Sequence, residues 1–217
     1  MKIKNILINE WKSLGISAYI PFLVYILLLF YCRLFRDDQR IIILALQAVL
    51  PVMSSWWVVL SFYNLVEEEG KEVFFSYPMN RWWIGIGRCL AFYILHMIIT
   101  YILIIFCSVD SVNIINVFIQ LAIQSFFFTG LSFMLVLLTQ NTSVSIAIPF
   151  GYCTFELLSE GKILSFINIY NFKVQFQLAE ISMNSNIIYI LLLSLLFMSI
   201  GQALILNKFG IYIEGKR

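Results

Sequence analysis

The chain has 217 residues, of which 61% are hydrophobic and 12% are charged, and its formal net charge is +2. A soluble domain carries about 25% charged residues, so the composition excludes a soluble globular protein and predicts an all-α polytopic membrane protein. The small net charge argues against a nucleic-acid partner. The four cysteines are scattered singly without a Cys-x-x-Cys pair, which indicates neither a metal site nor a disulfide framework.

Residues 1–15 are expected to form an amphipathic helix at the inner membrane surface. Apolar residues recur there at helical spacing, and lysines and asparagines occupy the other side. Lysines at such a surface extend their ammonium groups to the lipid headgroups. An unstructured cytosolic tail is the alternative. The apolar positions are Ile3, Ile6, Leu7, Trp11 and Leu14.

Six apolar runs follow, each with a length near the roughly 20 residues that cross a bilayer. The fifth run is the weakest, because it is short and is interrupted by Pro149 and Gly151. The first run is not expected to be a cleaved signal sequence, since it is long and no small-residue cleavage site follows it. The predicted spans are residues 16–35, 41–66, 83–107, 114–138, 143–158 and 186–206, within one transmembrane domain over 1–217.

The distribution of Lys and Arg sets the expected orientation. With both termini in the cytoplasm, the inner segments hold nine of these residues and the outer segments hold five, which favours that orientation. Residues 67–82 then lie in the cytoplasm and residues 159–185 lie outside. Apolar and polar residues alternate in the outer segment, which is either a surface loop or a re-entrant segment.

The segment 67–82 is the most informative part of the sequence. It begins with Glu67-Glu68-Glu69-Gly70-Lys71-Glu72 and continues with aromatic residues, Pro78 and Arg81. Each ionised group would cost about 2.5–3.5 kcal/mol inside the membrane, so the segment is expected in water. Its aromatic side chains suit a protein interface, and Pro78 would end a short helix.

This segment resembles the cytoplasmic loop after the second span of ABC-2-type transporter permease subunits. The family loop has an acidic cluster with a Gly, then a Glu, large apolar residues, a small residue, a Pro, and an Arg three places on. The family's Gly-Thr-x-Glu is replaced here by Gly70-Lys71-Glu72, which is one residue shorter. The predicted order of helices is also similar to that of the family. The matching positions are Glu72, Phe74, Phe75, Ser76, Pro78 and Arg81.

The resemblance implies a coupling helix that inserts into a groove on a separate ABC ATPase. The sequence has no G-x-x-x-x-G-K-[ST] motif, so the chain is not expected to be an enzyme, and ATP and Mg would bind to the partner. The family arrangement pairs two permease copies, or one copy and a sister permease, with two ATPase subunits in a bacterial cell membrane. The residues expected to contact the ATPase are Glu72, Phe74, Phe75, Tyr77, Pro78 and Arg81.

The resemblance further implies export of a substrate that the sequence does not identify. The many aromatic residues suit an amphipathic or hydrophobic cargo, of which an antimicrobial or toxic peptide is one example. Polar residues at helical spacing are candidates for the lining of a pathway between protomers. The alternative is that they only form hydrogen bonds to neighbouring helices. These residues are Gln47, Ser54, Ser61, Gln120 and Gln124.

Two other functional classes share features with this sequence. Glu67-Glu68-Glu69 and Phe92-x-x-x-His96 are similar to motifs of intramembrane proteases, which also need an Arg four residues after the second Glu and a second His. His96 is the only histidine, so water activation would be incomplete, and His96 is expected to be a packed polar residue with a partner in the bundle. A non-transporting accessory or immunity protein would share the composition and lack an ATPase partner.

Overall fold

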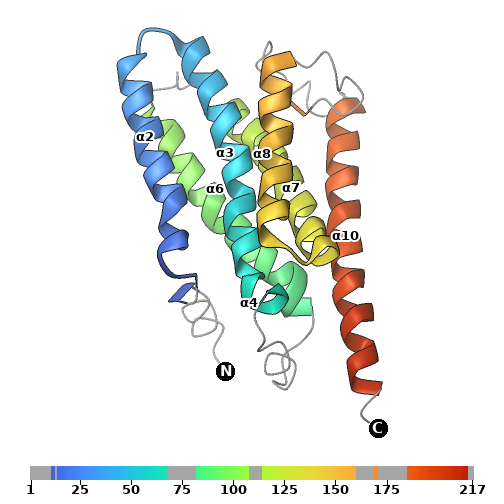
Figure 1. Cartoon of the computed structure of the whole chain (residues 1–217). Coiled ribbons are helices and arrows are strands. Elements are labelled where there is room, and N and C mark those ends of the chain that lie inside the picture. The colour runs from blue at the N-terminus through green and yellow to red at the C-terminus, as the bar shows by residue number, and fades with distance from the viewer. Residues whose placement is uncertain are drawn as a thin grey trace.

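The fold is a bundle of long helices, given by a computed structural model that describes residues 11–12, 14–67, 82–107, 114–159, 169–170 and 185–214 (Figure 1). Every regular element in these ranges is helical, as predicted. The elements are the 3₁₀-helix η1 (Gly15–Tyr19), α2 (Ile20–Leu34), α3 (Gln39–Ser61), α4 (Tyr63–Val66), the π-helix η2 (Trp83–Gly87), α6 (Arg88–Phe106), α7 (Ile114–Thr139), α8 (Thr142–Ser159) and α10 (Ser185–Glu214).

Five helical segments are long and apolar enough to cross a membrane, which is consistent with a multi-pass membrane protein. The predicted fifth span, 143–158, coincides with α8, which is not one of these five. Its sequence explains the difference, because Ser143, Ser145 and Glu156 interrupt the apolar residues. The five segments are Gly15–Leu34, Ile41–Ser61, Trp83–Phe106, Ile114–Thr139 and Ile187–Asn207.

The predicted second span, 41–66, is not one continuous helix. The helix α3 ends at Ser61, the chain turns at Phe62, and α4 continues over Tyr63–Val66. Within α3, Pro51 lacks the N–H group that would bond to the carbonyl of residue 47. Three residues later, the Ser54 hydroxyl donates a hydrogen bond to the Pro51 carbonyl (2.6 Å).

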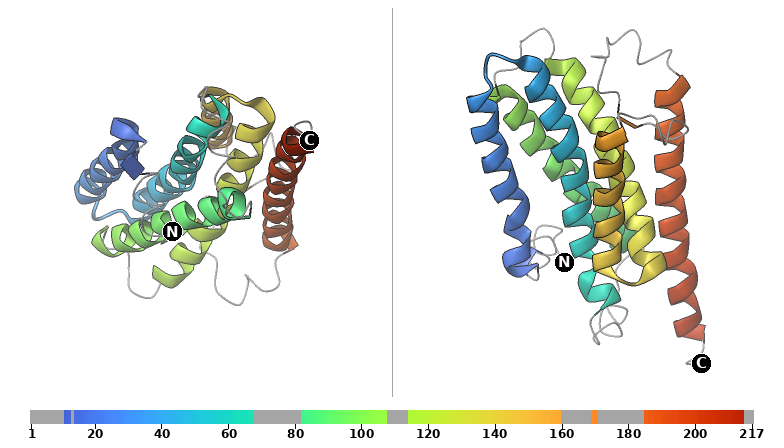
Figure 2. Two further views of the ribbon diagram at one scale, coloured as in Figure 1. Left: turned by 90° about the horizontal axis from the view of Figure 1, so that it is seen from below. Right: turned by 45° about the horizontal axis from the view of Figure 1, so that its top comes forward.

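The helix α7 occupies the centre of the bundle, where it packs against α3, α6, α8 and α10. It accordingly buries side chains on all its faces. The helix α2 lies at one edge and α10 at the other, as the view along the bundle shows (Figure 2). The long apolar side chains of α2 are exposed on its outer side, which is where lipid would cover them.

Two glycines allow α7 and α10 to approach closely. A Cβ atom at Gly130 would lie 2.8 Å from the backbone oxygen of Ser194, and one at Gly201 would lie 2.6 Å from the ring of Phe133. Small residues have this function at helix interfaces in membranes, where dispersion contacts replace the hydrophobic effect between helices.

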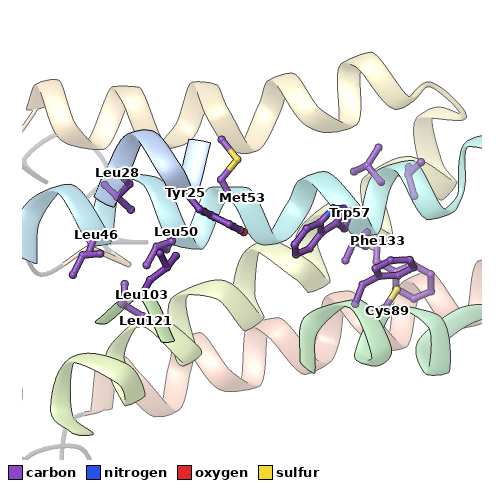
Figure 3. Packing of buried hydrophobic residues seen from close by; sticks show 14 of the residues in the cluster. Tyr25, Leu28, Leu46, Leu50, Met53, Trp57, Cys89, Leu103, Leu121 and Phe133 are labelled. Carbon is purple, nitrogen blue, oxygen red and sulfur yellow. The ribbon is translucent and has the colours of Figure 1, made fainter. Parts of the chain in front are cut away.

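The apolar core lies between α2, α3, α6 and α7, and its side chains interdigitate along the length of the bundle (Figure 3). The four cysteines are buried free thiols, and the Cys153 thiol lies 3.1 Å from the Ala48 carbonyl oxygen. The labelled core residues are Tyr25, Leu28, Leu46, Leu50, Met53, Trp57, Cys89, Leu103, Leu121 and Phe133.

Candidate functional site

The residues expected to contact an ATPase lie outside the described residues, so their role stays a prediction. The interfacial helix 1–15 and the outer segment 159–185 are described only at a few positions. The structure does describe both ends of residues 67–82, called the coupling segment after its predicted role, namely Glu67 and Trp82. The six residues predicted to contact the ATPase are Glu72, Phe74, Phe75, Tyr77, Pro78 and Arg81.

Glu67 joins the start of the coupling segment to the beginning of α8. One oxygen of its carboxylate, Oε1, accepts hydrogen bonds from the backbone N–H and the hydroxyl of Thr142, both at 2.7 Å. Thr142 is the first residue of α8. The first N–H groups of a helix lack partners within the helix and carry partial positive charge, so a carboxylate stabilises them.

The turn between α7 and α8, next to the contact of Glu67 with Thr142, has a defined conformation. Gln140 has a φ of 53°, which is the left-handed region that residues other than glycine rarely adopt. The Asn141 side chain accepts a hydrogen bond from the N–H of Val144 (3.0 Å), and the Ser145 hydroxyl donates to the Asn141 carbonyl (2.7 Å). The contact with Glu67 therefore connects the coupling segment to a compact corner between α7 and α8.

The second flank of the coupling segment is joined to α10. The π-helix η2 follows Trp82, and the Ile86 N–H donates to the Oε1 atom of Gln202 on α10 (3.1 Å). A Cβ atom at Gly85 would collide with this same oxygen, so glycine is needed for the contact. Single π-turns often occur at functional positions because they re-aim neighbouring groups.

A buried arginine connects the two helices on either side of the segment. Arg88 begins α6, and its Nη1 donates to the backbone carbonyl of Ser61 at the end of α3 (2.8 Å). Its guanidinium carbon lies 5.5 Å from the centroid of the Phe62 ring, within the range of a cation–π interaction. The end of α3, the start of α6, and α10 are thus held together by side chains that reach backbone groups.

The residues predicted to line a pathway lie inside the bundle, where each is at most 7% exposed. Ser54 lies 3.0 Å from the Ser125 carbonyl on α7, and Ser61 donates to the Val58 carbonyl (2.7 Å). The Ser54 contact is a bond to a neighbouring helix, as in the alternative interpretation, whereas the Ser61 bond lies within α3. Gln47 Oε1, Gln120 Nε2 and Gln124 Oε1 have no hydrogen-bond partner within the described ranges. A role in lining a pathway stays a prediction for all five.

His96 is the centre of a buried polar cluster whose other members could not be predicted from the sequence. Its Nδ1 lies 2.8 Å from the Tyr25 hydroxyl on α2, and its Nε2 lies 3.4 Å from the hydroxyls of Thr100 and of Ser125 on α7. Trp57 packs against the imidazole with a ring distance of 6.3 Å. His96 has the bundle partner that its solitary place in an apolar run predicted, and the cluster joins α2, α6 and α7.

Removal of the Tyr25 hydroxyl is expected to loosen α2. Tyr25→Phe leaves the ring in place and takes away the bond to His96 Nδ1, which is expected to lower the free energy of unfolding by about 0.6–1.7 kcal/mol. The measurement is unfolding in mixed micelles of increasing sodium dodecyl sulfate, followed by tryptophan fluorescence. Tyr31→Phe is the control, because Tyr31 lies on the exposed side of α2. Equal midpoints for the two variants would show that the bond adds nothing.

The described residues contain no group of three or more His, Cys, Asp or Glu that could hold a metal ion. Comparisons of the chain with protein-family models, with curated proteins and with solved structures gave no match. A functional assignment therefore depends on the sequence of residues 67–82 and on the contacts at both ends of that segment.

Proposed function

We propose that the chain is the transmembrane permease subunit of an ATP-driven exporter of the ABC-2 type. In this proposal α8 is the fifth of six spans, residues 1–15 lie along the inner surface, and both termini are in the cytoplasm of a bacterial cell. A second copy or a sister permease completes the pathway, and two separate ATPase subunits bind and hydrolyse ATP. The cargo is amphipathic or hydrophobic, with an antimicrobial or toxic peptide as one example.

Residues 67–82 carry this proposal, because they combine the coupling motif with polar attachments at both flanks. Glu67 is hydrogen-bonded to the first residue of α8, and the π-helix after Trp82 is hydrogen-bonded to α10. A displacement of the segment would therefore act on two different helices of the bundle. An ordinary surface loop needs no such attachment, since water satisfies its polar groups.

The path through α8 suits the transmission of such a displacement. Its first residue is held by Glu67, and Pro149 lies near its middle. A proline within a helix removes one backbone hydrogen bond and favours a bend there. The first half of α8 can then follow the coupling segment while the second half changes its angle. Alternating access to the two sides of the membrane would follow from this bend.

The test is recovery of an ATPase with the chain. The full-length chain, expressed together with its neighbouring genes and extracted in a mild nonionic detergent, is expected to bring down a soluble ATPase in a one-to-one ratio. The purified complex in lipid vesicles is expected to hydrolyse ATP and to move cargo only when ATP is present. If no ATPase is recovered and the chain alone protects cells from a toxic peptide, the accessory or immunity protein replaces this proposal.

The Glu67 contact gives a prediction specific to this route. Glu67→Gln replaces the anionic acceptor at Thr142 by a neutral amide, and is expected to lower the transport per ATP hydrolysed several-fold while ATP hydrolysis continues. Thr142→Ser keeps both donors and is expected to retain the wild-type ratio. An unchanged ratio in Glu67→Gln, with normal complex formation, would remove Glu67 from the route.

A further inference from the structure

A carboxyl group in α8 is buried without a hydrogen-bond partner among the described residues. Glu156 has a relative exposure of 0%, and neither Oε1 nor Oε2 accepts a hydrogen bond from any group in the part of the chain that the structure describes. Burial of an unpaired carboxylate is costly. An ionisable side chain within a helix bundle of a membrane protein is therefore a candidate for a functional site.

A second buried acceptor lies on the facing helix. Gln124 on α7 donates through Nε2 to the backbone carbonyl of Ile169 (3.1 Å), while its Oε1 has no partner within the described ranges. The hydroxyl of Tyr152 on the same helix interacts with the Glu156 carboxyl at longer range than a hydrogen bond, and Tyr170, which follows Ile169 in the chain, interacts with it electrostatically. The Glu156 carboxyl on α8 and the Gln124 Oε1 on α7 are thus two buried acceptors that have no hydrogen-bond partner within the described ranges.

Aromatic rings lie beside these oxygens. Phe128 is one helical turn from Gln124, and Tyr152 is one turn from Glu156. The ring of Phe128 lies 5.9 Å from that of Tyr152 and 6.0 Å from that of Tyr170, and the two tyrosines are stacked at 6.4 Å. The faces of such rings attract cations. The oxygens and the rings therefore favour the same kind of ligand.

We propose that Glu156, the Oε1 atom of Gln124 and the aromatic wall of Phe128, Tyr152 and Tyr170 form a binding site for an organic ammonium group. An ammonium supplies the positive charge that balances the Glu156 carboxylate, and the alkyl groups around its nitrogen pack on the aromatic rings. A primary ammonium can also donate a hydrogen bond to the Oε1 atom of Gln124. A calcium or magnesium ion would require six or more oxygen ligands, whereas aromatic faces select an alkylated cation.

The proposed entry route of the ammonium lies where Pro149 interrupts the backbone hydrogen bonds of α8. Pro149 leaves the carbonyl of Ser145 without its helical partner, and a Cβ atom at Gly151 would meet open space. Entry of the ligand requires the part of α8 after Gly151, which carries Tyr152 and Glu156, to move away from α7. Closure around the ligand restores the packing of Tyr152 against Phe128.

Binding of radiolabelled choline to the purified chain in dodecyl maltoside tests the proposal without ATP or an ATPase, so the site stands or falls separately from the proposed function. Choline is expected to bind saturably with one site per chain. Its neutral carbon analogue, 3,3-dimethylbutanol, is expected not to compete. Glu156→Gln is expected to weaken choline binding at least tenfold. Asp37→Asn, which removes an exposed carboxylate from the α2–α3 turn, is expected to leave binding unchanged.

Phe128→Leu provides a second variant, which keeps all charges, and is expected to weaken binding several-fold. If the natural ligand is the ammonium of a lipid headgroup, added phosphatidylcholine is expected to reduce choline binding. If the natural ligand is a free amine, phosphatidylcholine is expected to leave choline binding unchanged. A neutral galactolipid is the control. The proposal is overturned if wild type binds no choline, as when a lysine of the chain or a proton neutralises Glu156. It is also overturned if the neutral analogue competes equally, or if Glu156→Gln binds as wild type does.

Discussion

Gly130→Ala is expected to destabilise the bundle by about 1–3 kcal/mol. The added methyl group would lie 2.8 Å from the backbone oxygen of Ser194, and a backbone atom cannot rotate away as a side chain can. The helices α7 and α10 would have to separate along an extended contact. The expected observation is a lower midpoint in sodium dodecyl sulfate unfolding, together with loss of the native tryptophan emission at a lower temperature.

Gly151→Ala is the matched control for this effect. A Cβ atom at Gly151 has no neighbour within 4 Å, and alanine is better than glycine in a helix by about 1 kcal/mol. This variant is therefore expected to be as stable as wild type or more stable. If both alanine variants lower the midpoint equally, the close approach of α7 and α10 is not what makes Gly130 necessary.

The double substitution Phe74→Ala with Pro78→Ala is expected to abolish the coupling of ATP hydrolysis to transport. It removes an aromatic anchor and the residue that would end the coupling helix, so the partner ATPase loses its hold on the segment. Truncation of an interface anchor commonly costs about 2 kcal/mol or more, which is roughly a thirtyfold loss of affinity. Transport and ATP hydrolysis are measured in the same vesicles, and insertion is checked by the unfolding midpoint.

Ser76→Ala lies in the same segment and is expected to leave coupling unchanged. A double variant that inserts normally and transports as much cargo per ATP as wild type would contradict the assignment of residues 67–82. The Glu67→Gln variant separates binding of the ATPase from transmission to the helices. It leaves the aromatic anchors in place and alters only the connection to α8. Loss of ATPase binding is expected in the double variant and not in Glu67→Gln.

The sequence was sufficient for the helices and insufficient for the contacts between them. Long apolar runs have one stable solution in lipid, which is a helix, so five spans could be predicted from composition and length. The helix α8 was harder, since Pro149, two serines and Glu156 dilute its apolar character. The break at Phe62 was also not predictable, because it depends on how the end of α3 packs rather than on a proline or glycine.

The polar contacts join residues far apart in the chain. Glu67 bonds Thr142, Gln202 bonds Ile86, and Tyr25 bonds His96, and no local pattern pairs them. Ser54 and Ser61, which are seven residues apart, are both buried in α3. Glu156 was overlooked, although one signal was present: it is the single acidic residue within its apolar run.

The short corner between α7 and α8 has a consequence for biogenesis. Only Gln140 and Asn141 separate the two helices, so when α8 leaves the ribosome its predecessor is already at the membrane. The polar side chains Ser145 and Glu156 are buried within the bundle, where α8 packs against α3 and α7. In the proposed six-span arrangement, a helix too polar to partition into lipid alone can then enter the membrane as the second arm of a helical hairpin. In this order of events α7 serves as an intramolecular chaperone for the least apolar helix of the bundle.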